Sequence, residues 1–368
     1  MNLRKVIEND HEEKLYIAKI DEVMDYLRTY GATTFFDIIR NVGGSERRML
    51  RLLNEMVTDG AIYFKNDKFY INNNGFHDRY MCPTCNGKRV YTEDNLKEEL
   101  EKIWSQKPIP TLLFDQRPVT LDTTINRVLY MMSRNDVSGK KIVFLGDDDL
   151  TSLALGLYNR DADITVLDVD LRLVNFINRI SKEYDLNVKA YEYNVMDYLD
   201  NKYKNKFDVV MTDPTPEKVP FTIFMNACIH LLRREGIIYT SIYSSAMDRN
   251  LDLQKAITEM NLYITEIIPN FTEYQSIYGL FSNNDLELLK KYNIEIDSNS
   301  ICFTESLFRM IKNNESKPLK INYKLEDIFG KATKRVINDK NKDLDSDEYL
   351  DSIYENLSHL DDTIKTSE

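Results

Sequence analysis

The fold is decided by the stretch Lys140–Asp149, which reads KKIVFLGDDD. An apolar run, Ile142–Leu145, is followed by Gly146 and then by three consecutive aspartates. The residues from Leu150 to Arg160 continue with apolar side chains at helical spacing. A strand, a glycine turn and a helix in this order open a doubly wound α/β domain, in which ligands bind at the carboxyl ends of the strands.

The three aspartates, Asp147, Asp148 and Asp149, indicate which ligands this turn accepts. Dinucleotide-binding turns repeat glycine so that the backbone can approach a pyrophosphate, but here the glycine is single and acidic residues follow it. Carboxylates repel phosphates and carboxylates, and they attract amines. One aspartate is enough to cap the helix N-terminus, which is worth about 0.3–1 kcal/mol. We therefore expect at least one of the others to contact a ligand.

Composition supports a cationic ligand and argues against a protein that coats nucleic acid. The 368 residues include 48 Lys+Arg and 60 Asp+Glu, which gives a net charge of −12. A hydrophobic share of 42% predicts a soluble globular protein, and no run approaches the roughly 20 apolar residues of a membrane span. The charged start, Met1–Glu13, argues against a signal peptide and predicts a cytoplasmic location.

Residues 1–75 predict a winged helix-turn-helix domain, because three helical patterns precede a short hairpin. The helices are expected over Lys14–Arg28, Thr33–Asn41 and from an N-cap at Ser45 to Thr58, and the hairpin over Ile62–Ile71. Arg47, Arg48 and Arg51 lie near one face of the third helix, as in a DNA-contacting helix. Nearby acidic residues dilute this charge, so a structural or dimerising module is the alternative.

Residues 76–118 are expected to form a cysteine knuckle and a linker. Cys82 and Cys85 have the spacing of half a zinc site, whereas the other two cysteines of the chain are isolated. His77 or a second subunit would complete such a site, and a degenerate knuckle without metal is the alternative. The proline-containing linker carries Phe114-Asp115-Gln116-Arg117, which either folds over a ligand at the strand ends or merely connects.

Residues 119–330 alternate between strand and helix patterns, which predicts a mostly parallel sheet. Asp168 ends the second strand about 20 residues after the glycine turn, where an acidic side chain can bind ribose hydroxyls. Asn194 and Asp197 follow the third strand, and Asp197 can accept hydrogen bonds from an adenine amino group there. The expected nucleoside-binding residues are Gly146, Asp147, Asp168, Asn194 and Asp197.

The fourth strand, Phe207–Thr212, runs into Asp213-Pro214-Thr215-Pro216-Glu217. Two prolines give a rigid turn that donates no N–H at those positions, so carbonyls and the Asp213 carboxylate can accept hydrogen bonds from a nucleophilic amine. After residue 330 the chain becomes polar, and residues 331–368 are expected to form a flexible acidic tail.

These strand ends together resemble the adenosylmethionine-type nucleotide fold. With the N-terminal winged helix, the CPTCNGK knuckle and the FDQR segment, residues from about 15 to about 330 resemble the branched-chain polyamine synthases, the N(4)-bis(aminopropyl)spermidine synthases. The family more often reads DPPE at the fourth strand end. Here Thr215 separates the prolines, so Glu217 falls one position later than in that pattern.

The resemblance implies a Rossmann-like domain of the adenosylmethionine-dependent transferase type that acts as an aminopropyltransferase. It would move aminopropyl groups from decarboxylated S-adenosylmethionine to the secondary amine of spermidine and release methylthioadenosine. No tightly bound cofactor is expected, and whether zinc binds is left open. The expected partners are spermidine and related polyamines, and the protein is expected to form a homodimer and to bind neither nucleic acid nor a membrane. Asp213 would be catalytic, and the substrate-binding residues would be Asp148, Asp149, Pro214, Glu217 and Gln116.

Two other functions remain open at this point. An amino-methyltransferase acting on adenine in nucleic acid also uses an Asp-Pro turn at this strand end, although the turn here lacks an aromatic residue to stack a base. The second is a transcription regulator whose sheet domain senses a nucleoside.

Overall fold

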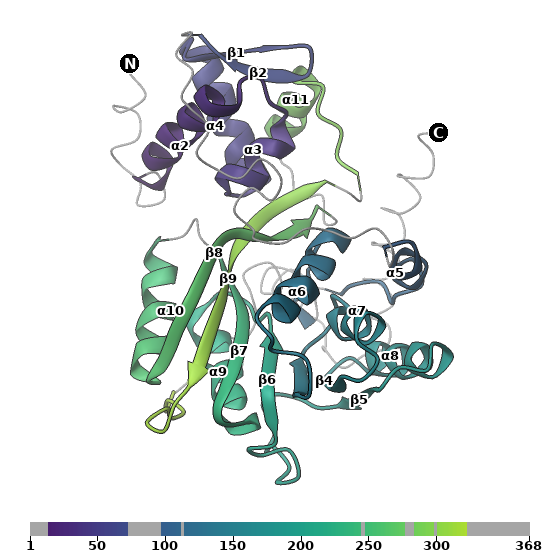
Figure 1. Ribbon diagram of the computed structural model, residues 1–368. Helices are drawn as coiled ribbons and strands as arrows, with labels where there is room; N and C mark the ends of the chain where they lie inside the picture. Colours follow the sequence, from purple (N-terminus) through teal and green to yellow (C-terminus); the bar gives the residue numbers. More distant parts are fainter. Residues whose placement is uncertain are drawn as a thin grey trace, which may run out of the picture.

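The computed structural model describes residues 14–72, 97–111, 114–243, 247–276, 283–297 and 300–321 (Figure 1). The predicted knuckle with Cys82 and Cys85, and the predicted tail at 331–368, lie outside these residues. Within the described ranges, no helix has both the length and the apolar character needed to cross a membrane.

A seven-stranded sheet forms the centre of the molecule, in the order β5-β4-β3-β6-β7-β9-β8. The strands span Lys141–Leu145 (β3), Asp163–Asp168 (β4), Val188–Glu192 (β5), Phe207–Thr212 (β6), Leu232–Tyr243 (β7), Leu262–Gln275 (β8) and Ile301–Lys312 (β9). The strands from β5 to β7 run parallel, and β9 is antiparallel to both of its neighbours. If β3 is counted as strand 1, the sheet order reads 3-2-1-4-5-7-6. This is the doubly wound order 3-2-1-4-5-6 with the seventh strand, β9, inserted before the sixth, β8. The predicted α/β class with a mostly parallel sheet is confirmed.

Helices cover both faces of this sheet, which explains why its central strands are continuously apolar. Alternate residues of β3 point to opposite faces: Ile142 and Phe144 join one core, and Val143 and Leu145 join the other. The first core contains residues of α5 (Lys97–Trp104), α6 (Leu121–Ser133), α7 (Thr151–Tyr158) and α8 (Leu171–Glu183). The second contains residues of α9 (Lys218–Leu231) and α10 (Met247–Glu259).

A third core belongs to the N-terminal module, which lies beside the end of the sheet formed by β8 and β9 (Figure 1). It consists of α2 (Lys14–Tyr30), α3 (Phe35–Val42), α4 (Glu46–Thr58) and the antiparallel pair β1 (Ile62–Lys65) and β2 (Lys68–Ile71). Residues from late in the chain complete this core, among them Leu289 of α11 (Asn283–Lys291), Tyr292 and Ile301.

The arginines of α4 contact α11. Arg51 Nε lies 2.6 Å from Asp285 Oδ1, Arg47 Nε lies 3.3 Å from Asp285 Oδ2, and the Asp285 side chain is 0% exposed. Two of the three arginines that would face DNA therefore pair with a carboxylate of α11.

Candidate active site

The candidate site lies at the carboxyl ends of β3, β4 and β6. Leu145 pairs with Leu167 on one side and with Thr212 on the other, so the residues that follow these strands emerge side by side. Gly146 turns the chain with φ +78°, and an added Cβ would meet no atom within 4 Å. The left-handed backbone, rather than crowding, is what requires glycine here.

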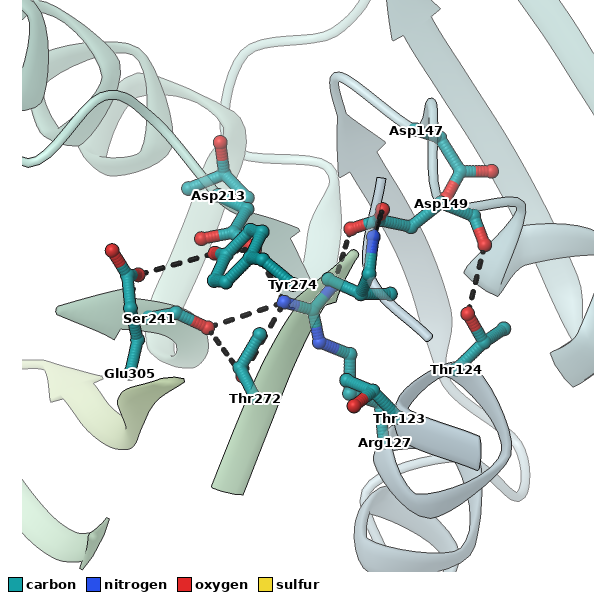
Figure 2. Close-up of polar contacts among 12 residues, drawn as sticks. Thr123, Thr124, Arg127, Asp147, Asp149, Asp213, Ser241, Thr272, Tyr274 and Glu305 are labelled. Atoms are coloured by element: carbon teal, nitrogen blue, oxygen red, sulfur yellow. Dashed lines mark hydrogen bonds and ion pairs between the residues drawn. The ribbon is translucent and has the colours of Figure 1, made fainter. Parts of the chain in front are cut away.

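The centre of the site is Arg127 of α6, whose side chain is 2% exposed (Figure 2). Its Nη1 donates to Asp149 Oδ2 at 2.6 Å, and its Nη2 donates to Asp213 Oδ2 and, at 3.2 Å, to Ser241 Oγ. Burial alone would lower the pKa of the guanidinium, but Asp213 and Asp149 raise it above its ordinary value. Arg127 thus ties the end of β3 to the end of β6.

A short chain of acidic and phenolic groups continues from Asp213 to β8 and β9. The Tyr274 hydroxyl lies 2.7 Å from Asp213 Oδ2 and 3.1 Å from Glu305 Oε2, and one hydroxyl proton cannot serve both acceptors. Burial and the neighbouring Asp213 raise the pKa of Glu305. Burial also raises the pKa of Asp213, against the lowering effect of Arg127. The arrangement favours a shared proton, and a bound cation would favour the ionised carboxylates.

The three aspartates of the glycine turn have different surroundings. Asp147 accepts the Ser152 N–H and hydroxyl, and Asp149 accepts the Val119 N–H at 2.9 Å besides its pair with Arg127. The Oδ2 atom of Asp148 is buried and has no hydrogen-bond partner within the described part of the chain. Burial, and after it Asp149, raises the pKa of Asp148. Of the three aspartates, Asp148 is the one with a buried carboxylate oxygen that no group of the described residues binds.

Asp168 sits where the sequence predicts it, at the end of β4, next to this turn. Its Oδ1 accepts the Asp170 N–H at 2.8 Å, and its Oδ2 accepts the Asp147 N–H at 2.9 Å. Burial raises the pKa of this carboxyl. A ribose hydroxyl would use the remaining lone pairs, since each oxygen already accepts one N–H. Asn194 and Asp197 lie exposed beyond β5, with Asn194 Oδ1 accepting the Met196 N–H at 3.0 Å.

The segment 114–118 lies at the strand ends, as one of the two alternatives for it requires. Asp115 hydrogen-bonds the Thr215 hydroxyl in the turn after β6. Gln116 donates to Asp170 Oδ2 at 3.0 Å and accepts the Thr111 N–H at 2.8 Å. Both ends of the Gln116 side chain therefore bind within the protein, which points to a positioning role rather than direct substrate contact.

The last two predicted substrate residues belong to the turn after β6. Pro214 is buried, while Glu217 is half-buried and precedes α9 without a side-chain capping bond. Sequence reasoning missed Arg127, Tyr274 and Glu305. The signal for Arg127 was its place among the apolar residues of a helix, since a buried arginine requires carboxylate partners. In the described ranges, no group of three His, Cys, Asp or Glu side chains is arranged to hold a metal ion.

The sequence matches a protein-family model and several known proteins. Residues 95–333 match the family model described as the branched-chain polyamine synthase A C-terminal domain. An uncharacterized protein of Methanocaldococcus jannaschii is 33% identical over 219 residues, covering 59% of this chain and 56% of that protein. The N(4)-bis(aminopropyl)spermidine synthase of the same organism is 36% identical over 209 residues, covering 54% of this chain and 59% of the relative. The chain therefore spans less than two thirds of the length of these two relatives.

The similarity is longer for a third relative and extends to a solved structure. The N(4)-bis(aminopropyl)spermidine synthase of Thermococcus kodakarensis is 30% identical over 295 residues, covering 74% of this chain and 83% of that protein. The crystal structure of the branched-chain polyamine synthase from Thermus thermophilus, in complex with N4-aminopropylspermidine and 5'-methylthioadenosine, matches with a TM-score of 0.60 at 20% identity. The match covers 82% of this chain and 90% of the Thermus thermophilus chain, so the two proteins share a fold. Because the family model matches well over half of its residues, the chain belongs to the branched-chain polyamine synthase family.

Proposed function

We propose that this protein transfers aminopropyl groups from decarboxylated S-adenosylmethionine to the secondary amine of spermidine. The observation that carries the proposal is the group of carboxyls at the strand ends, in which the half-buried Asp148 and Asp213 each have one buried oxygen without a hydrogen-bond partner in the described chain. Such oxygens suit ammonium groups, and relatives named as N(4)-bis(aminopropyl)spermidine synthases support a polyamine as the ligand.

Asp213 is the group that we place next to the reacting amine. Its Oδ2 is held by Arg127 and Tyr274, which leaves the buried Oδ1 as the acceptor for the nucleophile. The neutral amine attacks the propyl carbon next to the sulfonium, the carbon–sulfur bond breaks toward sulfur, and methylthioadenosine leaves. The nitrogen gains positive charge as the new bond forms, and the Asp213 carboxylate stabilises that charge. Because sulfonium is already a good leaving group, much of the rate comes from positioning.

Discrimination between donors follows from the absence of a carboxylate on the decarboxylated donor. Its aminopropyl ammonium matches the open Asp148 oxygen, whereas the carboxylate of ordinary adenosylmethionine would meet Asp147, Asp148 and Asp149. The nucleoside is proposed to lie along Gly146, Asp147, Asp168, Asn194 and Asp197.

We further propose that the three N-terminal helices and their hairpin are a winged-helix module with a structural role. The pairing of Arg47 and Arg51 with Asp285 supports that role over DNA recognition. The homodimer and the zinc site at Cys82 and Cys85 stay predictions.

The proposal is tested by the mass of the product formed from spermidine with each sulfonium donor. We expect the mass to rise by one and then by two aminopropyl groups with the decarboxylated donor, and methylthioadenosine to appear in equal amount. Methyl transfer from ordinary adenosylmethionine at a comparable rate would contradict the proposal.

A further inference from the structure

Lys107 is a buried cation beside the candidate site that none of the roles above uses. It follows α5, and its Nζ is buried without a hydrogen-bond partner in the described residues. The ammonium lies 3.9 Å from the centre of the Trp104 ring, which holds it by a cation–π contact.

The charged groups that face Lys107 are the carboxyls of the glycine turn. Burial lowers the pKa of the Lys107 ammonium to about 8, although Asp149, Asp148 and Asp147 all act to raise it. Burial and Asp149 raise the pKa of Asp148, Lys107 lowers it, and Asp168 and Asp213 raise it further. No ion pair joins Lys107 to any of them among the described residues, so Lys107 Nζ and Asp148 Oδ2 are both buried and unpartnered.

Unpaired buried charges are unfavourable, and each of these two groups would gain from a partner of opposite charge. A ligand ammonium at Asp148 would provide the partner for the aspartate, but it would bring a second positive charge close to Lys107. Two cations cannot both be accommodated at low cost in this buried setting.

We propose that the Lys107 ammonium competes with ligand amines for the ammonium subsite at Asp148. Lys107 balances the charge of the aspartates while the site is empty and loses its own charge when a ligand amine binds. This inference rests on the proposed function, since it takes the ligand to be an aliphatic polyamine or aminopropyl ammonium. On binding, the Lys107 ammonium gives its proton to the buffer and remains as a neutral amine. Lys107 thereby sets how strongly affinity for cationic ligands depends on pH.

The test compares the wild type with Lys107→Met, which keeps an unbranched side chain, one atom shorter, and removes the charge. Lys102→Met, at an exposed lysine of α5, is the matched control. With a pKa of about 8, releasing the proton weakens spermidine binding by about tenfold at pH 7 and hardly at all at pH 9.5. Because losing Lys107 also makes the Asp148 carboxyl harder to ionise, we expect Lys107→Met to bind spermidine more tightly than wild type at pH 7, by up to about tenfold, and equally at pH 9.5. Lys102→Met should match wild type at both.

Two further measurements test whether Lys107 is the group that loses the proton. Calorimetry at pH 7 in buffers of different ionisation enthalpy should show close to one more proton released on spermidine binding by wild type than by Lys107→Met. Trp104 is the single tryptophan of the chain, so its emission should titrate near pH 8 in wild type and Lys102→Met but not in Lys107→Met. Methylthioadenosine, which carries no ammonium, should bind all three proteins alike and shows that the variants are folded.

Equal or weaker spermidine binding by a folded Lys107→Met at pH 7, or unchanged proton release, would overturn the inference. Neither readout needs turnover, so a failure of every form to make product would contradict the proposed function separately. If no form binds spermidine, 1,3-diaminopropane serves as the ammonium probe, and the same comparison decides the role of Lys107.

Discussion

Asp148 and Asp149 are neighbours in the same glycine turn, yet their surroundings are opposite. Asp149 is held on both oxygens, by the Val119 N–H and by Arg127. Asp148 has a buried oxygen without a partner in the described chain. The same acidic motif therefore contains one carboxylate that joins parts of the protein and one that we propose binds a ligand.

The division has an energetic meaning. Arginine and a backbone N–H offset the cost of burying a carboxylate, whereas a buried carboxyl without a partner destabilises the fold until a cation binds. Function at Asp148 is therefore expected to oppose stability, as it often does at binding sites.

The largest effect is expected from Asp213→Asn, because this residue combines both conditions: one oxygen is paired and the other is open. Asparagine keeps the shape but loses the charge that stabilises the amine as it becomes cationic, so kcat should fall by about 10²–10⁴-fold. Binding of methylthioadenosine should stay within a few-fold. Product quantification and calorimetry measure the two, with Asp200→Asn at an exposed loop as control. Near-normal turnover would move the catalytic role to Glu305.

Arg127→Met should produce the largest loss of stability. It leaves Asp149 and Asp213 buried without their shared guanidinium, and breaking a buried ion pair from one side costs about 3–5 kcal/mol. Denaturant unfolding measures the loss. Adding Asp149→Asn to this variant should restore part of the stability, and a loss below about 1 kcal/mol would show that Arg127 is not the centre of the site.

Asp148→Asn and Asp149→Asn should change stability in opposite directions. Asp149→Asn weakens the pair with Arg127 and should cost about 1–3 kcal/mol. The raised pKa of Asp148 means that, from about pH 4 up to that raised value, the folded protein holds a proton that the unfolded chain has lost. This group therefore lowers stability as pH rises through that window, and Asp148→Asn should remove the loss while weakening spermidine binding.

Thermal unfolding between pH 4 and pH 8 measures both variants beside wild type. Equal destabilisation by the two substitutions would remove the distinction between these neighbouring aspartates.

The smallest effect is expected from Glu217→Gln. Glu217 is half-buried and makes no capping bond, so a substrate ammonium at this predicted substrate-binding residue would lie close to solvent. We expect the KM for spermidine to rise a few-fold with kcat unchanged, as measured by initial rates. A loss of kcat comparable to that of Asp213→Asn would place Glu217 at the reacting amine instead.

Local patterns predicted most elements of the fold but not the direction and position of its last strand, β9. The predicted Phe207–Thr212 strand agrees with β6 at both ends, because an apolar run bounded by a turn is a local signal. That β9 inserts antiparallel between β7 and β8 is a matter of long-range pairing, which strand–helix alternation does not encode.

For the candidate site too, the sequence indicated only the residues that a local pattern marks. The Asp148 and Asp213 positions follow from strand ends in the chain, whereas Arg127, Tyr274 and Glu305 come from a helix and from the two antiparallel strands. Nothing in the local sequence separates Asp148 from Asp149, since their difference lies in which partner reaches each one across the fold.

The position of β9 also affects how the chain folds as it leaves the ribosome. Among the described strands, β8 pairs with β9 alone, at Ile301–Lys312, and Ile301 also completes the core of the N-terminal module. Until these residues have been synthesised, β8 presents an unpaired edge and the module made first lacks part of its core. Glu305, on the same strand, reaches the candidate site only at that moment. Pairing of β8, completion of the N-terminal core and assembly of the site are therefore expected to be one late event during synthesis.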